Sequence, residues 1–475
     1  MVSVKGAFSR GLAGGLALLA ASVSAKAATP SLVADLVTGE VIAQEQATKP
    51  WYPASLTKLM TVYVALQAVR DGRITMDTPF VMSQRAARAA PSKMGFNPGT
   101  EVTLDNALKM LMVKSANDLA IMIAEGISGS VEDFAVEMNR AAASLGMRQS
   151  HFVNPNGLFD PNHYSSARDM AVLARALYTE FPQEADLYGI GALKLGDRII
   201  PTHNGLLGRY PGADGMKTGF VCPSGFNVVA SALRNGRHMV VVVMGSPNAK
   251  ARTIKAASLL DLGFGASGFL RKANLNSLPD IAGPPPNLRQ EICGRHKKTP
   301  QEDDLAAVNN PAESGDSAAA FFANDGRPPA PTLVMGGPRP SFEPIEVFVG
   351  RKPDWTGPVA MARGAPATAP AAPVANASAF AAQQGIGATA SRAIAVKSTP
   401  NKPELKKASA HMTPQLAKMK AAAEKRTAEK KHVAKKTEPA PKTAEKNKSE
   451  PARKLVAQKK PEPAKTASKA KEKAQ

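Results

Sequence analysis

The chain has 475 residues and a formal net charge of +21, which is unevenly distributed. Residues 401–475 contain 22 Lys and Arg against 8 Glu and no aromatic residue, so this tail contributes +14 and the rest of the chain only +7. A charge of that size is ordinary for a globular domain. The basic composition therefore does not indicate a nucleic-acid-binding fold.

The first 27 residues have the pattern of a secretory signal peptide. Lys5 and Arg10 supply positive charge ahead of an apolar run over 11–23, and Ala25 and Ala27 place small side chains on either side of Lys26 at the expected cleavage site. The apolar run is short for a membrane span, which leaves an uncleaved anchor as the weaker alternative. We therefore expect an exported, periplasmic protein, either free or peripheral on the outer face of the inner membrane.

Residues 28–266 are expected to form one folded domain, whose first part mixes strand and helix signals. β-Forming residues around Thr38-Gly39 predict a hairpin over 31–44. Apolar residues at helical spacing predict a helix over 55–70, with Gly72 just beyond its end. Residues 84–102, which contain Gly and Pro, are expected to be irregular.

The second part of this domain begins with helices and ends in strands. Asn235-Gly236 between two apolar runs is a strong hairpin signal. Together these elements predict an α+β fold, in which helices flank a mainly antiparallel sheet. The predicted helices cover 104–113, 118–125, 131–145, 168–177 and 249–262, the strands 216–222, 226–233 and 238–244, and a polar loop 151–166.

The pattern weakens beyond residue 266. Residues 267–400 are rich in Pro, Ala and Gly and are expected to be mostly unstructured, with a short strand near 344–355 as the exception. Residues 401–475 form a Lys/Ala/Pro-rich tail that is expected to be disordered.

The two cysteines, Cys222 and Cys293, have no Cys or His at metal-ligand spacing. In an exported chain they can form one disulfide or remain two free thiols, and the sequence does not separate these alternatives. The seven histidines form no His-Glu-x-x-His pattern, so a zinc hydrolase has no support. The Cys and His spacing therefore does not predict a metal site.

The first motif is Ser55-Leu56-Thr57-Lys58, at the predicted start of a helix. Residues three apart in a helix lie on one face, so Lys58 is expected beside Ser55. A serine hydroxyl needs a neighbouring base to act as a nucleophile, and a lysine held neutral by burial or nearby positive charge can be that base. The backbone N–H groups at a helix start can also stabilise an oxyanion.

The second motif, Ser115-Ala116-Asn117, separates two predicted helices. A break there can turn Ser115 and Asn117 into a cleft, where a hydroxyl relays a proton and an amide binds substrate. The simpler alternative is that one of these side chains caps the helix that follows, and alone the motif favours that alternative.

The third motif, Lys217-Thr218-Gly219, lies on a predicted strand. The charge of Lys217 and the hydroxyl of Thr218 suit a substrate carboxylate. Gly219 has no side chain and lets a substrate backbone approach closely. The simpler alternative is an ordinary edge strand without a binding role.

All three motifs occur in one order and in these contexts, which is the pattern of penicillin-binding proteins and class A β-lactamases. The sequence around them resembles the D-alanyl-D-alanine carboxypeptidase family of low-molecular-mass penicillin-binding proteins. The resemblance extends from about residue 31 to residue 265. It includes the segments 53–61, 114–118, 152–158 and 217–227.

The resemblance implies a serine peptidase that removes the terminal D-alanine from peptidoglycan stem peptides, with β-lactams as covalent inhibitors. Ser55 would attack the carbonyl between the two terminal D-alanines, and Lys58 would take its proton. Ser115 would pass a proton toward the leaving D-alanine. Water would then hydrolyse the acyl-enzyme.

The resemblance also implies the binding residues. Asn117 would orient the substrate, and Lys217 and Thr218 would hold its terminal carboxylate beside Gly219. The N–H groups of Ser55 and Phe220 would form the oxyanion hole. A D,D-endopeptidase that cuts peptidoglycan cross-links would use the same motifs, so the sequence leaves it as the alternative.

A β-lactamase, a wall-binding protein and a nucleic-acid binder are each less well supported. A β-lactamase would carry a Glu-x-x-Leu-Asn pattern between the second and third motifs, and residues 118–216 contain none. A non-catalytic wall-binding protein would not need Lys58, and a nucleic-acid binder does not need an export signal. The carboxypeptidase family often has a second, all-β domain and an amphipathic membrane anchor, and the region after residue 283 resembles neither.

The composition of the basic tail favours a solvated chain without a specific partner. The alternative hypothesis is that the tail contacts anionic lipid or cell-wall polymer weakly, through charge alone. Deleting residues 401–475 should therefore reduce the fraction of protein that sediments with membranes at low salt. The measurement is membrane fractionation of the full chain and the deletion variant side by side. Unchanged fractionation would count against the contact.

Overall fold

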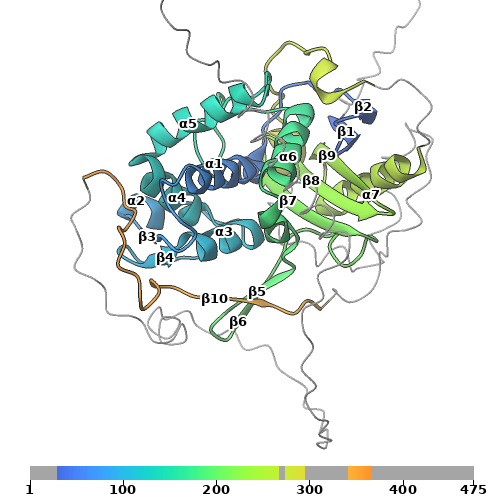
Figure 1. Cartoon of the computed structure of the whole chain (residues 1–475). Coiled ribbons are helices and arrows are strands. Elements are labelled where there is room, and N and C mark those ends of the chain that lie inside the picture. The colour runs from blue at the N-terminus through green and yellow to red at the C-terminus, as the bar shows by residue number, and fades with distance from the viewer. Residues whose placement is uncertain (1–28, 267–272, 295–340, 365–475) are drawn as a thin grey trace, which may run out of the picture. The chain divides into compact units, whose positions relative to one another are not determined.

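The computed structural model describes residues 29–266, 273–294 and 341–364 (Figure 1). Its centre is a five-stranded sheet with the strand order β2-β1-β9-β8-β7, in which every neighbouring pair is antiparallel. The strands are β1 (Ser31–Asp35), β2 (Val41–Glu45), β7 (Ala213–Val221), β8 (Gly225–Arg234) and β9 (Arg237–Ser246).

The longest hairpin of the sheet joins β8 to β9 through Asn235-Gly236. Both turn residues have positive φ, 49° and 75°, which Asn and Gly adopt more readily than other residues. Most of β8 and β9 is buried. Strands covered on both faces carry continuous apolar runs rather than an alternating pattern, which is what these two show.

Helices pack on both faces of the sheet (Figure 1). Alternate residues of β9 face two separate clusters: Val240 and Val242 join the larger one, and Val241 and Val243 join the smaller one beneath α7 (Ala249–Gly265). The larger cluster is formed with α1 (Lys58–Arg70), α3 (Leu104–Val113), α4 (Asn117–Ser128), α5 (Val131–Ser144) and α6 (Ala167–Glu180).

The predicted α+β class is confirmed, and several details differ from the sequence expectation. The expected helix at 55–70 begins with a 3-10 turn, η1 (Ala54–Thr57), before α1. The expectation that 84–102 is irregular holds for 88–100 but was wrong at both ends of the segment, which contain α2 (Gln84–Ala87) and most of β4 (Glu101–Thr103). Ser83 caps α2 by accepting a hydrogen bond from Ala86 N, so a local signal for this helix is present in the sequence.

Small sheets lie beside the helical layer. β4 pairs with β3 (Pro79–Val81), and β5 (Ala192–Leu195) pairs with β6 (Arg198–Pro201). A short 3-10 stretch, η2 (Pro182–Gly189), leads into β5. None of β3, β5, β6 and η2 was expected from the sequence.

Residues 341–364 fold back onto these small sheets. The expected short strand is present as β10 (Ile345–Val347), which pairs in parallel with β5. Further along, Gly350 N donates to Glu101 O, Arg351 binds the Glu101 carboxylate, and Ala360 exchanges backbone hydrogen bonds with β3. Backbone pairing thus holds this segment to the edges of both small sheets.

Residues 273–294 also pack against the domain. They contain η3 (Leu275–Ser277) and α8 (Arg289–Cys293), with Leu275 and Ile292 buried. Asp280 binds the guanidinium groups of Arg148 and Arg168 at 2.9 and 3.1 Å. The packed structure therefore includes residues beyond 266, while the expected signal peptide at 1–27 and the tail at 401–475 lie outside the described residues.

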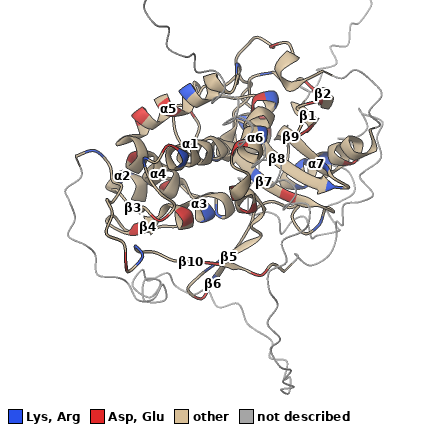
Figure 2. Ribbon diagram, viewed as in Figure 1, with Lys and Arg blue, Asp and Glu red and all other residues tan. Residues whose placement is uncertain are grey.

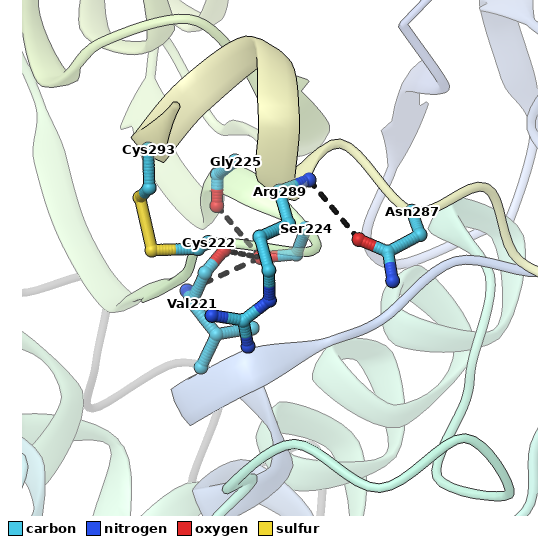
Figure 3. Close-up of a disulfide and its surroundings, with 7 residues drawn as sticks. All are labelled: Val221, Cys222, Ser224, Gly225, Asn287, Arg289 and Cys293. Carbon is cyan, nitrogen blue, oxygen red and sulfur yellow. Dashed lines mark hydrogen bonds between the residues drawn. A yellow bond between two sulfur atoms is a disulfide. The ribbon is translucent and has the colours of Figure 1, made fainter. Parts of the chain in front are cut away.

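Cys222 and Cys293 form a disulfide, which decides between the two alternatives left open by the sequence (Figure 3). The bridge joins the end of β7 to the end of α8, across 71 residues of sequence. It therefore fixes a segment that follows the domain to the strand that carries the third motif.

Within the described ranges, no helix is both long and apolar enough to cross a membrane. Acidic and basic residues occur on the same helices, as Figure 2 shows for α5. Such mixing of signs differs from the clustered basic face that nucleic-acid binding requires.

Candidate active site

Ser55 lies in η1, directly before α1. Its Oγ is 3.1 Å from the Nζ of Lys58, as the three-residue spacing predicts. Ala54 precedes it with φ of +50°, a left-handed conformation that is strained for a residue other than glycine. Such strain is held only where the surroundings fix it, and it commonly occurs at functional sites.

The side chain of Lys58 is fully buried. Besides Ser55 Oγ, its Nζ lies 2.7 Å from Asn117 Oδ1 and 2.7 Å from the carbonyl oxygen of Asn156. Those two oxygens can only accept hydrogen bonds, whereas a serine hydroxyl can also donate one. The Nζ of Lys58 donates to both of these oxygens and lies within hydrogen-bond distance of Ser55 Oγ, so this buried amine connects Ser55 with two other segments of the chain.

The second motif forms the break between α3 and α4. Ser115 has φ of +62°, and its Oγ accepts a hydrogen bond from Lys217 Nζ at 3.0 Å. Asn117 also donates from Nδ2 to the carbonyl oxygens of Ala90 and Pro91. The capping alternative was wrong, because the N-cap of α4 is Ala116 and no side chain caps it.

The third motif lies on β7, at the edge of the five-stranded sheet. An edge strand leaves backbone groups for an extended ligand, so the edge-strand alternative and the binding interpretation agree. Lys217 and Thr218 are buried there. Thr218 Oγ1 has no hydrogen-bond partner among the described residues, which is unusual for a buried hydroxyl and suits a site that binds a polar group.

Gly219 brings β7 against Ser55 itself. A Cβ atom at this position would lie 2.8 Å from Ser55 N and 3.0 Å from Leu56 N. Close packing against η1 therefore requires a glycine at this position, whereas the sequence suggested that only the substrate does. Phe220 follows on β7, with its ring 4.4 Å from that of Phe226.

The loop over 151–166 forms the floor of the site, a role that its sequence did not indicate. Asn156 supplies the carbonyl that binds Lys58. Gly157 has φ of +83°, and a Cβ there would lie only 1.8 Å from Ala54 O. The Asn-Pro-Asn-Gly sequence indicated a turn, but only the fold places that turn under η1.

His163, which belongs to this loop, connects the loop to η1. Its Nε2 lies 2.7 Å from Thr57 Oγ1, and its Nδ1 accepts a hydrogen bond from Val153 N. Burial is the largest cause that lowers the pKa of His163 to about 3, and the charge of nearby His151 is the second cause. The imidazole is therefore neutral, with its proton on Nε2.

Two further side chains hold the walls of the site. Asn227 on β8 donates from Nδ2 to the carbonyl oxygens of Tyr52 and Pro53, just before Ser55. Asp118 accepts hydrogen bonds from Met94 N and Gly95 N, and so holds the loop that contacts Asn117. Burial raises the pKa of Asp118, although these hydrogen bonds oppose the rise.

The described residues contain no group of three or more His, Cys, Asp or Glu that could hold a metal ion. The polar groups around Ser55 are instead an amine, amides, hydroxyls and backbone groups. This set suits acyl transfer to a serine hydroxyl.

The sequence profile of the D-alanyl-D-alanine carboxypeptidases matches residues 18–248. A Mycobacterium tuberculosis relative, the D-alanyl-D-alanine carboxypeptidase DacB2, is 32% identical over 242 residues, which are 49% of this chain and 81% of the relative. The chain belongs to this family. The resemblance inferred from the motifs is thereby confirmed.

Two other carboxypeptidases of this family match over a similar region. DacA of Haemophilus influenzae is 36% identical over 235 residues, and DacF of Bacillus subtilis is 34% identical over 232 residues. Each match covers 48% of this chain, but only 60% of the first relative and 59% of the second. The chain thus matches these two carboxypeptidases over about three fifths of their length.

Replacing Gly157 by alanine should displace the nucleophile. The new Cβ would overlap Ala54 O, and the left-handed backbone would be strained, for a combined loss of about 2–4 kcal/mol in unfolding free energy. D-Alanine release, the activity that names the family, should fall by about tenfold or more, because Ser55 would move with Ala54. Urea unfolding and a release assay measure the two effects.

Gly146→Ala is the matched control, since Gly146 has φ of +73° but a Cβ added there would meet no atom within 4 Å. It should lose only about 1–2 kcal/mol, from backbone strain, and keep its activity. Equal losses in the two variants would contradict the proposed contact with Ala54.

His163 should make the protein less stable in acid. Its folded pKa of about 3 lies below the ordinary value of 6.5, so between these values the unfolded chain binds a proton that the folded chain does not. Stability is therefore lost as the pH falls below 6.5, by about 2 kcal/mol at pH 5 from this residue. Urea unfolding at pH 7 and pH 5 should show a smaller loss for His163→Asn than for the wild type.

His151→Asn serves as the control, because His151 is an exposed histidine in the same loop. Its pH dependence should stay close to that of the wild type, because burial, and not the charge of His151, is the largest cause of the lowered His163 pKa. The assignment of the acid sensitivity to His163 would be wrong if His163→Asn lost as much stability as the wild type.

Proposed function

We propose that the protein is a serine-type D-alanyl-D-alanine carboxypeptidase that acts through an acyl-enzyme on Ser55. The observation that carries the proposal is the contact of Ser55 Oγ with the buried Nζ of Lys58. This Nζ also contacts two uncharged oxygens, Asn117 Oδ1 and the carbonyl oxygen of Asn156. This arrangement supplies a base to a serine without a histidine or a metal.

In the acylation step, Ser55 Oγ attacks the carbonyl carbon between the two terminal D-alanines while its proton passes to Lys58. The new Oγ–C bond forms, and the negative charge on the carbonyl oxygen is stabilised by the N–H groups of Ser55 and Phe220. The C–N bond then breaks. The leaving D-alanine takes a proton from the Lys58 ammonium, for which Ser115 provides a path.

In the deacylation step, a water molecule attacks the acyl carbon as Lys58, again neutral, accepts its proton. The Oγ–C bond breaks, and the proton returns to Ser55 Oγ. The shortened peptide leaves with a new terminal carboxylate. A β-lactam would acylate Ser55 in the same way, as a substrate mimic that is released slowly.

Substrate binding depends on the edge strand β7. The terminal carboxylate of the peptide would accept hydrogen bonds from Lys217 Nζ and Thr218 Oγ1, and the buried Thr218 hydroxyl would thereby gain a partner. Asn117 would orient the peptide amide. Export to the periplasm, which the first 27 residues predict, would bring the enzyme to peptidoglycan and give it a role in cell-wall biogenesis and cell shape.

The test is release of free D-alanine from a pentapeptide that ends in D-Ala-D-Ala. The wild type should release it, and Ser55→Ala should lower the rate by at least about a thousandfold, because the covalent step is lost. Ser144→Ala, in which the lost hydroxyl donates to Ala141 O at the end of α5, should keep the wild-type rate.

Equal release by the wild type and Ser55→Ala would overturn the mechanism. Release from cross-linked muropeptides alone would favour the D,D-endopeptidase alternative instead.

A further inference from the structure

The disulfide places α8 beside the carboxyl-terminal end of β7, just beyond the third motif. Cys222 follows the last residue of β7, and its partner Cys293 is the last residue of α8 (Figure 3). At the other end of this short helix, Leu288 N donates to Pro223 O at 2.9 Å. Two links therefore fix α8 beside the turn between β7 and β8.

From this position α8 contacts the loop that forms the floor of the site. The guanidinium carbon of Arg289 lies 6.0 Å from the ring centroid of Phe159. The ring of Phe159 is in turn 5.0 Å from that of Tyr52, three residues before the nucleophile. The guanidinium thus lies at the end of the site, between β7 and the 151–166 loop.

The groups at this end are accessible to a ligand. Phe159 is 41% exposed, a large value for an aromatic side chain. Arg289 is exposed, and among the described residues no carboxylate lies within ion-pair distance of it. An exposed arginine on an exposed ring offers both a charge and an apolar surface.

A negative charge lies next to the same ring. Asp160 follows Phe159, and its carboxylate accepts a hydrogen bond from Asn162 N at 2.8 Å. The pKa of the Tyr52 phenol is raised first by burial and second by the negative charge of Asp160, so the two side chains lie close together. Phe159 is therefore flanked by Asp160 in its own loop and by Arg289 on α8.

The proposed function sets the direction of the peptide along β7. Lys217 and Thr218 would hold the terminal carboxylate, and Ser55 and Phe220 would hold the carbonyl one residue upstream. Strands and extended peptides both advance about 3.3 Å per residue. The third residue from the carboxyl end would therefore lie near the end of β7, where Phe159 and Arg289 meet.

We propose that Arg289, Phe159 and Asp160 form a subsite for the side chain of the residue before the two D-alanines, and that this subsite selects a diamino dicarboxylic acid. Arg289 would bind the distal carboxylate with paired N–H groups, and Asp160 would bind the distal ammonium. Phe159 would cover the methylene groups between them. This inference rests on the proposed function and names the substrate class of the same site.

The test compares two pentapeptides that end in D-Ala-D-Ala and differ only in their third residue. One carries meso-diaminopimelate and the other lysine, which lacks only the distal carboxylate. The full chain should have a kcat/KM about fivefold higher for the diaminopimelate peptide, the size expected of an exposed ion pair. In Arg289→Gln this ratio should fall to about one, and in Arg289→Glu it should fall further, because like charges repel.

Two more variants separate the subsite from general effects. Asp160→Asn should lower kcat/KM for both peptides and keep their ratio, because both peptides carry the distal ammonium. Arg198→Gln, which removes an exposed arginine on β6, should change neither value.

A wild type that hydrolyses both peptides equally, or an Arg289→Gln that keeps the wild-type ratio, would overturn the subsite while the proposed function stands. A wild type that releases D-alanine from neither peptide would overturn the proposed function and the subsite with it.

Discussion

The buried amine of Lys58 is the contact on which the rest of the site depends. It binds Ser55 from its own helix, Asn117 from the start of α4 and Asn156 from the 151–166 loop. A buried amine that lost one of these partners would be left with an unsatisfied polar group, at a cost of about 1–3 kcal/mol. One side chain therefore holds together three segments that are far apart in sequence, and the same side chain is the proposed base.

Close backbone packing fixes the position of this network. Gly219 and Gly157 each leave no room for a Cβ, the first against Ser55 N and the second against Ala54 O. Ser55, the proposed nucleophile, is thus held between the edge strand and the 151–166 loop by backbone atoms, which have fewer alternative positions than side chains. The left-handed conformation of Ala54 follows from the same restraint, since such strain persists only where neighbouring structure determines it.

The sequence predicted what depends on local pattern. The hairpin at Asn235-Gly236, the central helices and the three motifs all have short-range signals, and the structure contains them. Asn156 and His163 could not be found in this way, because each acts through a contact with a segment about 100 residues away. The fold alone decides which polar loop lies under η1, so the loop was identifiable as a turn but not as part of the site.

The structure of the region beyond residue 266 could not be predicted from local pattern either. Its composition predicted little structure, yet parts of it pack onto the domain through contacts that leave no periodic pattern: a disulfide, the binding of Asp280 by two arginines, and a parallel three-residue strand. A short segment held at a few fixed points does not need an amphipathic pattern of its own. Because one of those points is the end of β7, the segment adds Arg289 to a site whose chemistry lies entirely within the domain before it, and it can change specificity without changing the catalytic groups.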